Sequence, residues 1–286
     1  MDVGIGLGNT LLEMAPGTLV VWARRAEARG FSSLATIGRV AWPGYEEFVA
    51  LSAAAAVTER IGLLTDIALV PTYDAARLAK LTASLDAISG GRFTLGVGVG
   101  ARPDDYAVTG VDFGERGRRL DRQLEVLHES WAGRPALGPS TSFGPPPTMG
   151  RIPILFGGDP VRAGRRAARW EGGFTIGGAP PEAAAGMVAA FRESYASAGG
   201  SGNPRVVCLS YFGLGDEAES LRQLRAYYAF TGDRAEMIAA GAARSADGVR
   251  RRVEAYREMG VDELVFSPSI PVADEVDRLA EIVFGT

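Results

Sequence analysis

Three glycines near the start of the sequence are spaced like those of a nucleotide-binding turn. Residues 4–9 read Gly-Ile-Gly-Leu-Gly-Asn and end a short apolar run. A dinucleotide-binding turn opens directly into a helix, and an acidic residue follows about 20 positions later at the end of the second strand. Here residues 11–16 intervene, and the second apolar run ends in Thr-Ile-Gly at 36–38. We therefore interpret these glycines as turn residues and keep Asn9 as a candidate for a substrate pocket.

A second glycine-rich segment, residues 89–100, alternates glycine with apolar residues. It reads Ser-Gly-Gly-Arg-Phe-Thr-Leu-Gly-Val-Gly-Val-Gly. Glycines at alternate positions of a buried strand leave room for another backbone or for a flat ligand, where side chains would collide. Tight packing inside the fold explains the same pattern. The segment by itself leaves both interpretations open.

Composition excludes several kinds of chemistry. Cys208 is the only cysteine and His128 the only histidine, so neither a disulfide framework nor a zinc site is expected. Acidic residues outnumber basic ones by 34 to 30 and no basic stripe alternates with aromatic residues, which argues against nucleic acid as a partner. The first residues carry no basic, apolar leader, and the apolar run 53–57 is too short to cross a membrane. We expect a cytoplasmic protein without a metal.

The elements that must position a site alternate regularly along the chain. Short apolar runs are typical of buried parallel strands, and the longer amphipathic runs between them are typical of covering helices. The predicted strands are 3–7, 33–37, 61–69, 93–99, 153–156, 173–176, 206–212 and 263–266. The predicted helices are 18–29, 45–58, 74–87, 115–131, 161–170, 182–198, 247–259 and 272–284, with more helical material at 216–243. Asp74 is a predicted N-cap and Gly30 a predicted helix end.

Eight strand–helix units favour an α/β fold of the (β/α)₈ TIM-barrel type over an open doubly wound sheet, which usually has fewer strands. A Pro- and Gly-rich stretch at about 133–153 interrupts the alternation, but neither side of it alone provides a complete sheet. We interpret it as a surface excursion. The prediction is therefore one domain over 1–286 with insertions at about 133–153 and 216–243. The second insertion is expected to cover substrate or to form a subunit contact.

Several motifs, in this order along the chain, resemble the luciferase-like monooxygenase family of flavin- and deazaflavin-dependent barrels. Each motif is weak alone, but together they cover nearly the whole sequence. They are Thr-Asp-Ile-Ala-Leu-Val-Pro at 65–71, Ala-Lys at 79–80, Leu-Asp-Ala-Ile-Ser-Gly-Gly-Arg-Phe at 85–93, Gly-Val-Gly-Val-Gly at 96–100, Gly-Val-Asp-Phe at 110–113, Arg-Gly-Arg-Arg-Leu-Asp at 116–121, Pro-Ile-Leu-Phe-Gly-Gly at 153–158 and Gly-Val-Asp-Glu-Leu at 260–264.

The resemblance implies a cofactor across the carboxyl-terminal mouth of the barrel, where the loops after the strands also place active sites. By this likeness Asp66, Ile67 and Ala68 form a bulge with a non-prolyl cis peptide between Asp66 and Ile67, which supports the ring system from behind. Without the likeness, Ile67 and Ala68 read as plain core. The residues implied at the ring edge and ribityl chain are Gly98, Gly100, Ala101 and Arg102.

Two further positions are implied for the cofactor phosphate. Arg116, at the start of a predicted helix, would approach it. The turn Phe156-Gly157-Gly158 also suits phosphate, because glycine amides at a helix N-terminus form an anion site, and Arg162 would add a charge-assisted contact. The alternative is that Arg116 and Arg162 lie on solvent-exposed helix faces and bind no phosphate.

The sequence departs from its relatives after the second predicted strand. Many relatives have a His or Asp there, whereas this chain has Thr-Ile-Gly-Arg at 36–39, so the catalytic residues are unknown. His128, near a helix end, is expected on the surface or in a structural contact rather than in catalysis. Arg39, Trp42 and Tyr45 follow the second strand and could shape the substrate pocket, with Arg39 attracting an acidic or carbonyl group.

The expected function is that of a luciferase-like oxidoreductase that acts on paired donors. It would oxidise a small organic substrate with reduced FMN and oxygen. A separate flavin reductase is a candidate partner, and the family likeness suggests a homodimer. The alternative within the fold is hydride transfer with the deazaflavin coenzyme F420, although the missing His or Asp argues mildly against it. An alternative of another class is a flavin-binding partner subunit without turnover.

Overall fold

Parallel strands form a closed ring in the computed structural model, which describes residues 1–137 and 144–285. The order around the ring is β3-β2-β1-β9-β8-β7-β6-β5-β4, and β3 also pairs with β5. The strands are β1 Asp2–Gly6, β2 Ser33–Thr36, β3 Gly62–Thr65, β4 Ala68–Leu69, β5 Phe93–Gly98, β6 Ile154–Gly157, β7 Gly173–Ile176, β8 Val206–Phe212 and β9 Glu263–Pro268. Since β3 and β4 are two halves of one position beside β5, the ring has eight positions. The predicted TIM barrel is confirmed.

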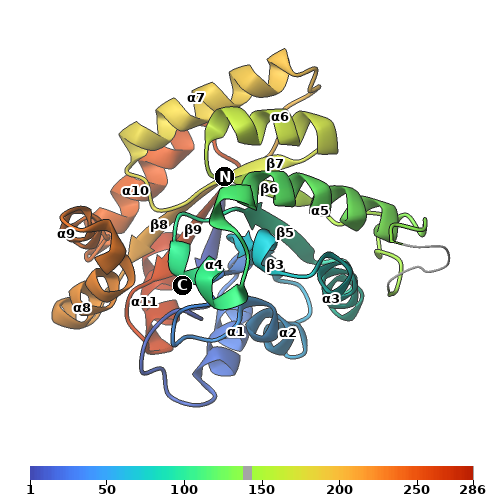
Figure 1. Ribbon diagram of the computed structural model, residues 1–286. Coiled ribbons are helices and arrows are strands. Elements are labelled where there is room, and N and C mark those ends of the chain that lie inside the picture. The colour runs from blue at the N-terminus through green and yellow to red at the C-terminus, as the bar shows by residue number, and fades with distance from the viewer. Residues whose placement is uncertain (138–143, 286) are drawn as a thin grey trace.

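Helices surround this ring (Figure 1). They are α1 Thr18–Ala28, α2 Glu47–Ala55, α3 Ala75–Ile88, α4 Pro103–Thr109, α5 Arg116–Trp131, α6 Pro160–Trp170, α7 Pro181–Ser197, α8 Glu217–Tyr228, α9 Arg234–Ala240, α10 Ala246–Glu258 and α11 Asp274–Phe284. Asp74 caps α3 by accepting a hydrogen bond from the Arg77 amide, as predicted. Gly30 follows α1 with a φ of 86°, a left-handed conformation that glycine adopts without a steric penalty.

The core has two layers. Large side chains such as Trp22, Phe48, Phe93 and Phe174 are buried in the cluster that packs helices against strands. A smaller cluster fills the barrel itself, and it consists of Ala35, Leu64, Leu155, Val207 and Val265, one from each of five strands. The barrel interior is therefore packed rather than open. A ligand site must lie at one end of the strands.

The structure differs in two places from the ranges that the apolar pattern predicted. The third predicted strand, 61–69, is interrupted after Thr65, so it forms β3 and β4. The predicted loop 100–113 contains α4, although Pro103 followed by Asp104 and Asp105 is a helix-start pattern that could have revealed it. The insertion 216–243 forms α8, a 3₁₀ segment Ala229–Thr231 and α9.

Of the stretch 133–153, residues 138–143 lie outside the described residues, and the rest contains neither helix nor strand. Among the helices described here, none has both the length and the apolar character needed to cross a membrane.

Candidate functional site

A cavity of about 300 Å³ lies at the carboxyl ends of the strands. Its walls come from the ends of β2, β4, β5 and β8, from the bulge between β3 and β4, and from the insertion after β8. The residues that line it are Ile37, Gly38, Arg39, Asp66, Ile67, Leu69, Gly100, Ala101, Arg102, Asp105, Gly177, Leu209, Tyr211, Tyr227, Tyr228 and Phe230. We call this the mouth cavity.

The bulge between β3 and β4 forms one wall of the mouth cavity. The peptide bond between Asp66 and Ile67 is cis, as the resemblance implied. Glycines of β5 make room for the bulge: a Cβ on Gly96 would lie 1.9 Å from the Thr65 carbonyl oxygen, and one on Gly98 would lie 2.5 Å from Ile67 Cδ1. The structure shows both interpretations of the alternating glycines, because another backbone approaches closely at Gly96 and a side chain packs tightly against Gly98.

Asp66 brings a carboxyl group into the mouth cavity. The Thr175 hydroxyl donates to its Oδ1 at 2.6 Å, whereas its Oδ2 is buried and has no hydrogen-bond partner among the described residues. Burial raises the pKa of Asp66 to about 6, against the effect of the Thr175 hydrogen bond, and the nearby Glu263 charge adds to the rise. Sequence reasoning assigned Asp66 to the cofactor and missed this proton-holding capacity.

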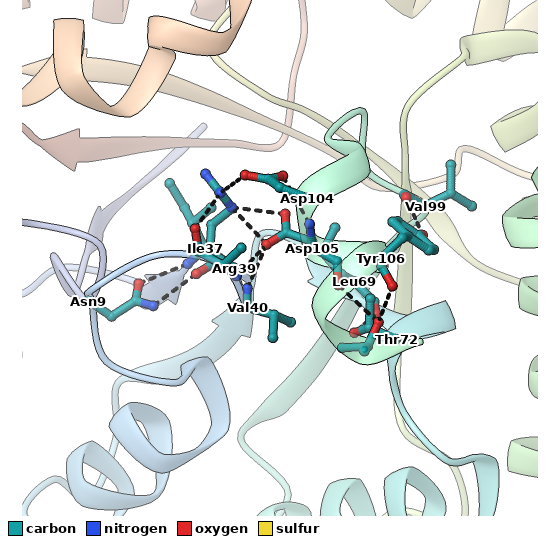
Figure 2. Close-up of polar contacts among 12 residues, drawn as sticks. Asn9, Ile37, Arg39, Val40, Leu69, Thr72, Val99, Asp104, Asp105 and Tyr106 are labelled. Carbon is teal, nitrogen blue, oxygen red and sulfur yellow. Dashed lines mark hydrogen bonds and ion pairs between the residues drawn. The ribbon is translucent and has the colours of Figure 1, made fainter. Parts of the chain in front are cut away.

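Arg39 and Asp105 form a buried ion pair at the edge of the mouth cavity (Figure 2). Arg39 Nε lies 2.9 Å from Asp105 Oδ2, and the two side chains are only 5% and 1% exposed. Asp105 Oδ1 also accepts hydrogen bonds from the backbone amides of Val40 and Ala41, at 2.9 and 2.7 Å. Asp105 thus holds the loop after β2 against α4, while Arg39 Nη1 stays buried without a partner among the described residues.

Asn9 lies behind the mouth cavity and does not line it. Its amide donates to the backbone oxygens of Ile37 and Tyr45, at 2.8 and 3.0 Å, and its Oδ1 accepts from the Ile37 amide at 2.9 Å (Figure 2). Because these bonds use both ends of the amide, Asn9 braces the loop rather than facing a ligand. Trp42 donates to the Thr10 carbonyl and packs its ring 5.3 Å from that of Tyr227.

Three aromatic residues of the insertion, Tyr227, Tyr228 and Phe230, close the mouth cavity from above, and we call them the aromatic cover. The guanidinium of Arg102 lies 4.2 Å from the ring centre of Tyr227 and 3.8 Å from that of Phe230. The hydroxyls of Tyr228 and Tyr211 are 2.7 Å apart. The insertion therefore forms part of the wall of the mouth cavity, and its predicted role over a substrate stays a prediction.

A second cavity, of about 510 Å³, lies between α5 and α6 and reaches Val99 at the end of β5. Six arginines line it against one acid, Asp121; they are Arg116, Arg118, Arg162, Arg165, Arg166 and Arg169. Arg118, Arg166 and Arg169 pair with Glu115, Asp121 and Glu125. Among the described residues Arg162 and Arg165 have no ion pair. We call this the arginine cavity.

The arginine cavity unites two residues that were predicted near phosphate, Arg116 and Arg162. Arg116 Nη1 donates to the Phe113 carbonyl at 2.7 Å, and its buried Nε has no partner among the described residues. The other residues predicted near phosphate, Phe156, Gly157 and Gly158, do not line this cavity. Asp159 caps α6 by accepting from the Arg162 amide at 2.9 Å, so an acid occupies the helix end that the prediction gave to phosphate.

Other predicted cofactor residues serve the packing around the bulge. Ala68 and Phe156 are buried in the outer core cluster. Gly157 does not line either cavity, and a Cβ there would lie 3.0 Å from Ile67 Cγ2. Gly158 has a φ of 101° and lines neither cavity. Their spacing indicated a turn, but only the folded chain shows which atoms the turn faces.

His128 lies at the opposite end of the barrel, in a cavity with residues that precede β6 and β7. Its ring stacks on Trp170 with 4.1 Å between ring centres, and its Nδ1 lies 2.9 Å from the Leu124 carbonyl oxygen. Burial lowers the pKa of His128. The ring thus makes structural contacts and lines neither candidate cavity, although Trp170, on which it stacks, also lines the arginine cavity.

His128→Ala is expected to cost about 1 kcal/mol of the free energy of unfolding, because an aromatic pair is lost. Cofactor affinity is expected to stay unchanged. Denaturant unfolding and a cofactor titration of the variant check both. A tenfold weaker cofactor affinity in a folded variant would contradict the structural role.

The fold and the geometry of the mouth agree with one known family. The sequence profile of luciferase-like monooxygenases matches residues 3–268. The chain belongs to this family. The structure that was expected from the motifs, a barrel with a bulged third strand, is therefore that of a luciferase-like monooxygenase.

Two relatives illustrate the range of the family. An uncharacterised protein of Mycobacterium tuberculosis is 34% identical over 189 residues, which are 56% of this chain and 65% of that protein. The F420-dependent glucose-6-phosphate dehydrogenase of Kribbella flavida is 32% identical over 142 residues, which are 46% of this chain and 42% of that enzyme. Both matches span less than two thirds of the relative's own length.

Two solved structures share the fold. A monooxygenase from Streptomyces bottropensis superposes with a TM-score of 0.76 at 23% identity, covering 99% of this chain and 97% of that one. The oxygenating constituent of 3,6-diketocamphane monooxygenase from Pseudomonas putida, in complex with FMN, superposes with a TM-score of 0.74 at 18% identity, covering 99% and 96%. Family members and neighbours thus include flavin-dependent and F420-dependent oxidoreductases.

Proposed function

We propose that this luciferase-like monooxygenase holds reduced FMN with its ring in the mouth cavity and its phosphate in the arginine cavity. The observation that carries the proposal is the position of the two cavities, one at the bulge and one at the end of β5, on either side of residues 99–102. The first cavity is mostly apolar and suits a flat ring. The second offers unpaired arginines for a phosphate.

Both cavities contain buried polar atoms that a bound cofactor could supply with a hydrogen-bond partner. Arg116 Nε in the arginine cavity and Asp66 Oδ2 in the mouth cavity are buried without hydrogen-bond partners among the described residues, and buried polar groups normally have one. When bound, the reduced cofactor would supply two electrons to dioxygen, so that one oxygen atom enters the substrate and the other leaves as water.

The chain's own residues would orient the reactants and exclude water. Ile67 supports the ring, the aromatic cover keeps water out, and Asp66 can hold a proton at Oδ2 up to about pH 6. A separate flavin reductase would supply the reduced FMN, and a small organic molecule would be the substrate.

The second candidate is hydride transfer with coenzyme F420. It is favoured by the arginine cavity, because more arginines line this cavity than one phosphate of FMN needs, and F420 carries an acidic tail beyond its phosphate. The similarity to an F420-dependent dehydrogenase supports the same candidate. Separate titrations with reduced FMN and with F420 compare the two directly.

Charge reversal in the arginine cavity tests the proposed phosphate position. Arg162→Glu combined with Arg165→Glu is expected to weaken FMN binding at least tenfold, because a charge-assisted contact is lost and repulsion is added. The matched control combines Arg251→Glu with Arg257→Glu, two exposed arginines of α10. Fluorescence titration measures both. Equal affinity in the two double variants would remove the arginine cavity from the cofactor site.

A further inference from the structure

Arg102 is a buried cation without an anionic partner. Its residue is only 8% exposed, it lines the mouth cavity, and among the described residues its guanidinium makes no hydrogen bond and no ion pair. Its contacts are the faces of Tyr227, Tyr228 and Phe230, at 4.2, 5.8 and 3.8 Å. Aromatic faces compensate a guanidinium charge only in part. A buried charge normally has a counter-ion.

The carboxylates around the mouth cavity do not supply that counter-ion. Asp105 is committed to Arg39 and to two backbone amides. Asp104 sits at the rim, with its side chain 54% exposed, and pairs with Arg39 at 3.2 Å. Asp66 Oδ1 accepts from Thr175, and Asp66 makes no ion pair with Arg102; its Oδ2, like Asp105 Oδ2, is buried without a hydrogen-bond partner among the described residues. Arg39 itself keeps a buried, unpartnered Nη1. The mouth cavity thus holds two guanidinium groups with free donors.

The proposed cofactor does not supply an anionic partner for Arg102 either. Its phosphate is placed in the arginine cavity, on the other side of residues 99–102. Its ring is placed on the bulge side of the mouth cavity, at Ile67. The remaining side, between Arg39, Arg102 and the aromatic cover, is where a substrate would lie.

We propose that the substrate is a small organic carboxylate, which Arg102 and the free Nη1 of Arg39 bind beneath the aromatic cover. The planar fork of a guanidinium matches the two oxygens of a carboxylate. The walls of the cavity are otherwise mainly apolar, so the rest of the molecule is a compact apolar group that lies beside the cofactor ring. This inference rests on the proposed function in giving the cofactor phosphate to the arginine cavity and the cofactor ring to the bulge side of the mouth cavity.

Benzoate and benzamide test the proposal, because they have nearly the same shape and differ in charge. Calorimetric titrations are made with the full chain, with and without saturating FMN. We expect benzoate to bind at least tenfold more tightly than benzamide, and this preference to survive FMN. Arg102→Met is expected to remove the preference, since methionine packs between the rings without a charge. Arg102→Gln serves as a second variant if the first does not fold.

Arg251→Met, at an exposed position of α10, is the matched control and is expected to keep the preference for benzoate. The proposal is overturned if benzoate binds no better than benzamide, if Arg102→Met and Arg102→Gln keep the preference, or if FMN abolishes it. The last result would assign these arginines to the cofactor. If FMN does not bind but the preference depends on Arg102, the proposed cofactor fails while the carboxylate site stands.

Discussion

Gly96→Ala is expected to reduce the free energy of unfolding by about 3 kcal/mol or more, which is the upper range for overpacking a core. The reason is the position of the Thr65 carbonyl oxygen, 1.9 Å from the place that the new Cβ would take. This oxygen belongs to the backbone at the bulge, and the Thr65 hydroxyl also donates to the Gly96 carbonyl at 2.9 Å. Neither strand can move without breaking pairing between β3 and β5.

Two matched variants separate this clash from the general effect of replacing glycine. Gly98→Ala meets only the side chain of Ile67, with Cδ1 at 2.5 Å and Cγ1 at 3.1 Å, and a side chain can move more easily than a backbone, so the cost is expected to be smaller than for Gly96→Ala. Gly186→Ala lies in α7, where a Cβ meets nothing within 4 Å, and is expected to stabilise the chain by up to about 1 kcal/mol. Urea unfolding measures all three. A Gly96→Ala protein as stable as Gly98→Ala would contradict the close approach.

The free energy of unfolding of the unchanged chain is expected to fall as the pH rises through the pKa of Asp66. Asp66→Asn is expected to abolish this fall. The folded chain raises the pKa of Asp66 from 3.8 to about 6, so the unfolded chain releases this proton first. Stability is therefore lost between pH 4 and pH 6, and the loss reaches about 3 kcal/mol above that range. At pH 7 the variant is expected to be more stable than the unchanged chain, and at pH 3.5 the two are expected to be similar.

Other groups around Asp66 set the conditions of this experiment. The negative charge of Glu263 also acts on Asp66. Burial and the Asp66 charge raise the pKa values of three nearby groups, the hydroxyls of Tyr211 and Tyr228 and the thiol of Cys208. Burial raises the pKa of Glu47 to about 7, so Glu47 also lowers the stability as the pH rises. This effect is the same in the variant and in the unchanged chain, and it cancels when the two are compared.

Asp233→Asn, at an exposed position before α9, is the control. Denaturant unfolding from pH 3.5 to pH 8 measures the difference between each variant and the unchanged chain. A difference for Asp66→Asn that is flat with pH, or that falls as the pH rises, would contradict the raised pKa.

Much of the fold could be predicted because parallel strands buried on both faces form short apolar runs. The predicted ranges 173–176 and 206–212 coincide with β7 and β8. The sequence carries no comparable signal for the break between β3 and β4. Asp66-Ile67-Ala68 follows three apolar or small residues, and no turn residue marks the end of the strand. It was expected only through the family resemblance.

The candidate site was harder to predict, because its contacts join residues far apart in the sequence. The glycines before Arg102 indicated a ligand at the end of β5, but nothing in the sequence pairs Arg102 with Tyr227 or Phe230. Asn9 was a reasonable ligand group until its amide proved to be used by Ile37 and Tyr45. Asp159 follows the predicted phosphate turn directly, and its preference for a helix N-cap was the signal against phosphate there.

The pairing of β1 with β9 has a consequence for how the chain acquires its structure. Asp2 lies in register with Glu263, so barrel closure joins residues about 260 positions apart. At a synthesis rate of about 5–20 residues per second, β1 emerges roughly 10–50 s before its partner. During this time one edge of β1 has no neighbour, and the Glu263 carboxylate that binds Ser33 and Arg205 is absent. The barrel thus has a high contact order and is expected to close late, after release of most of the chain from the ribosome.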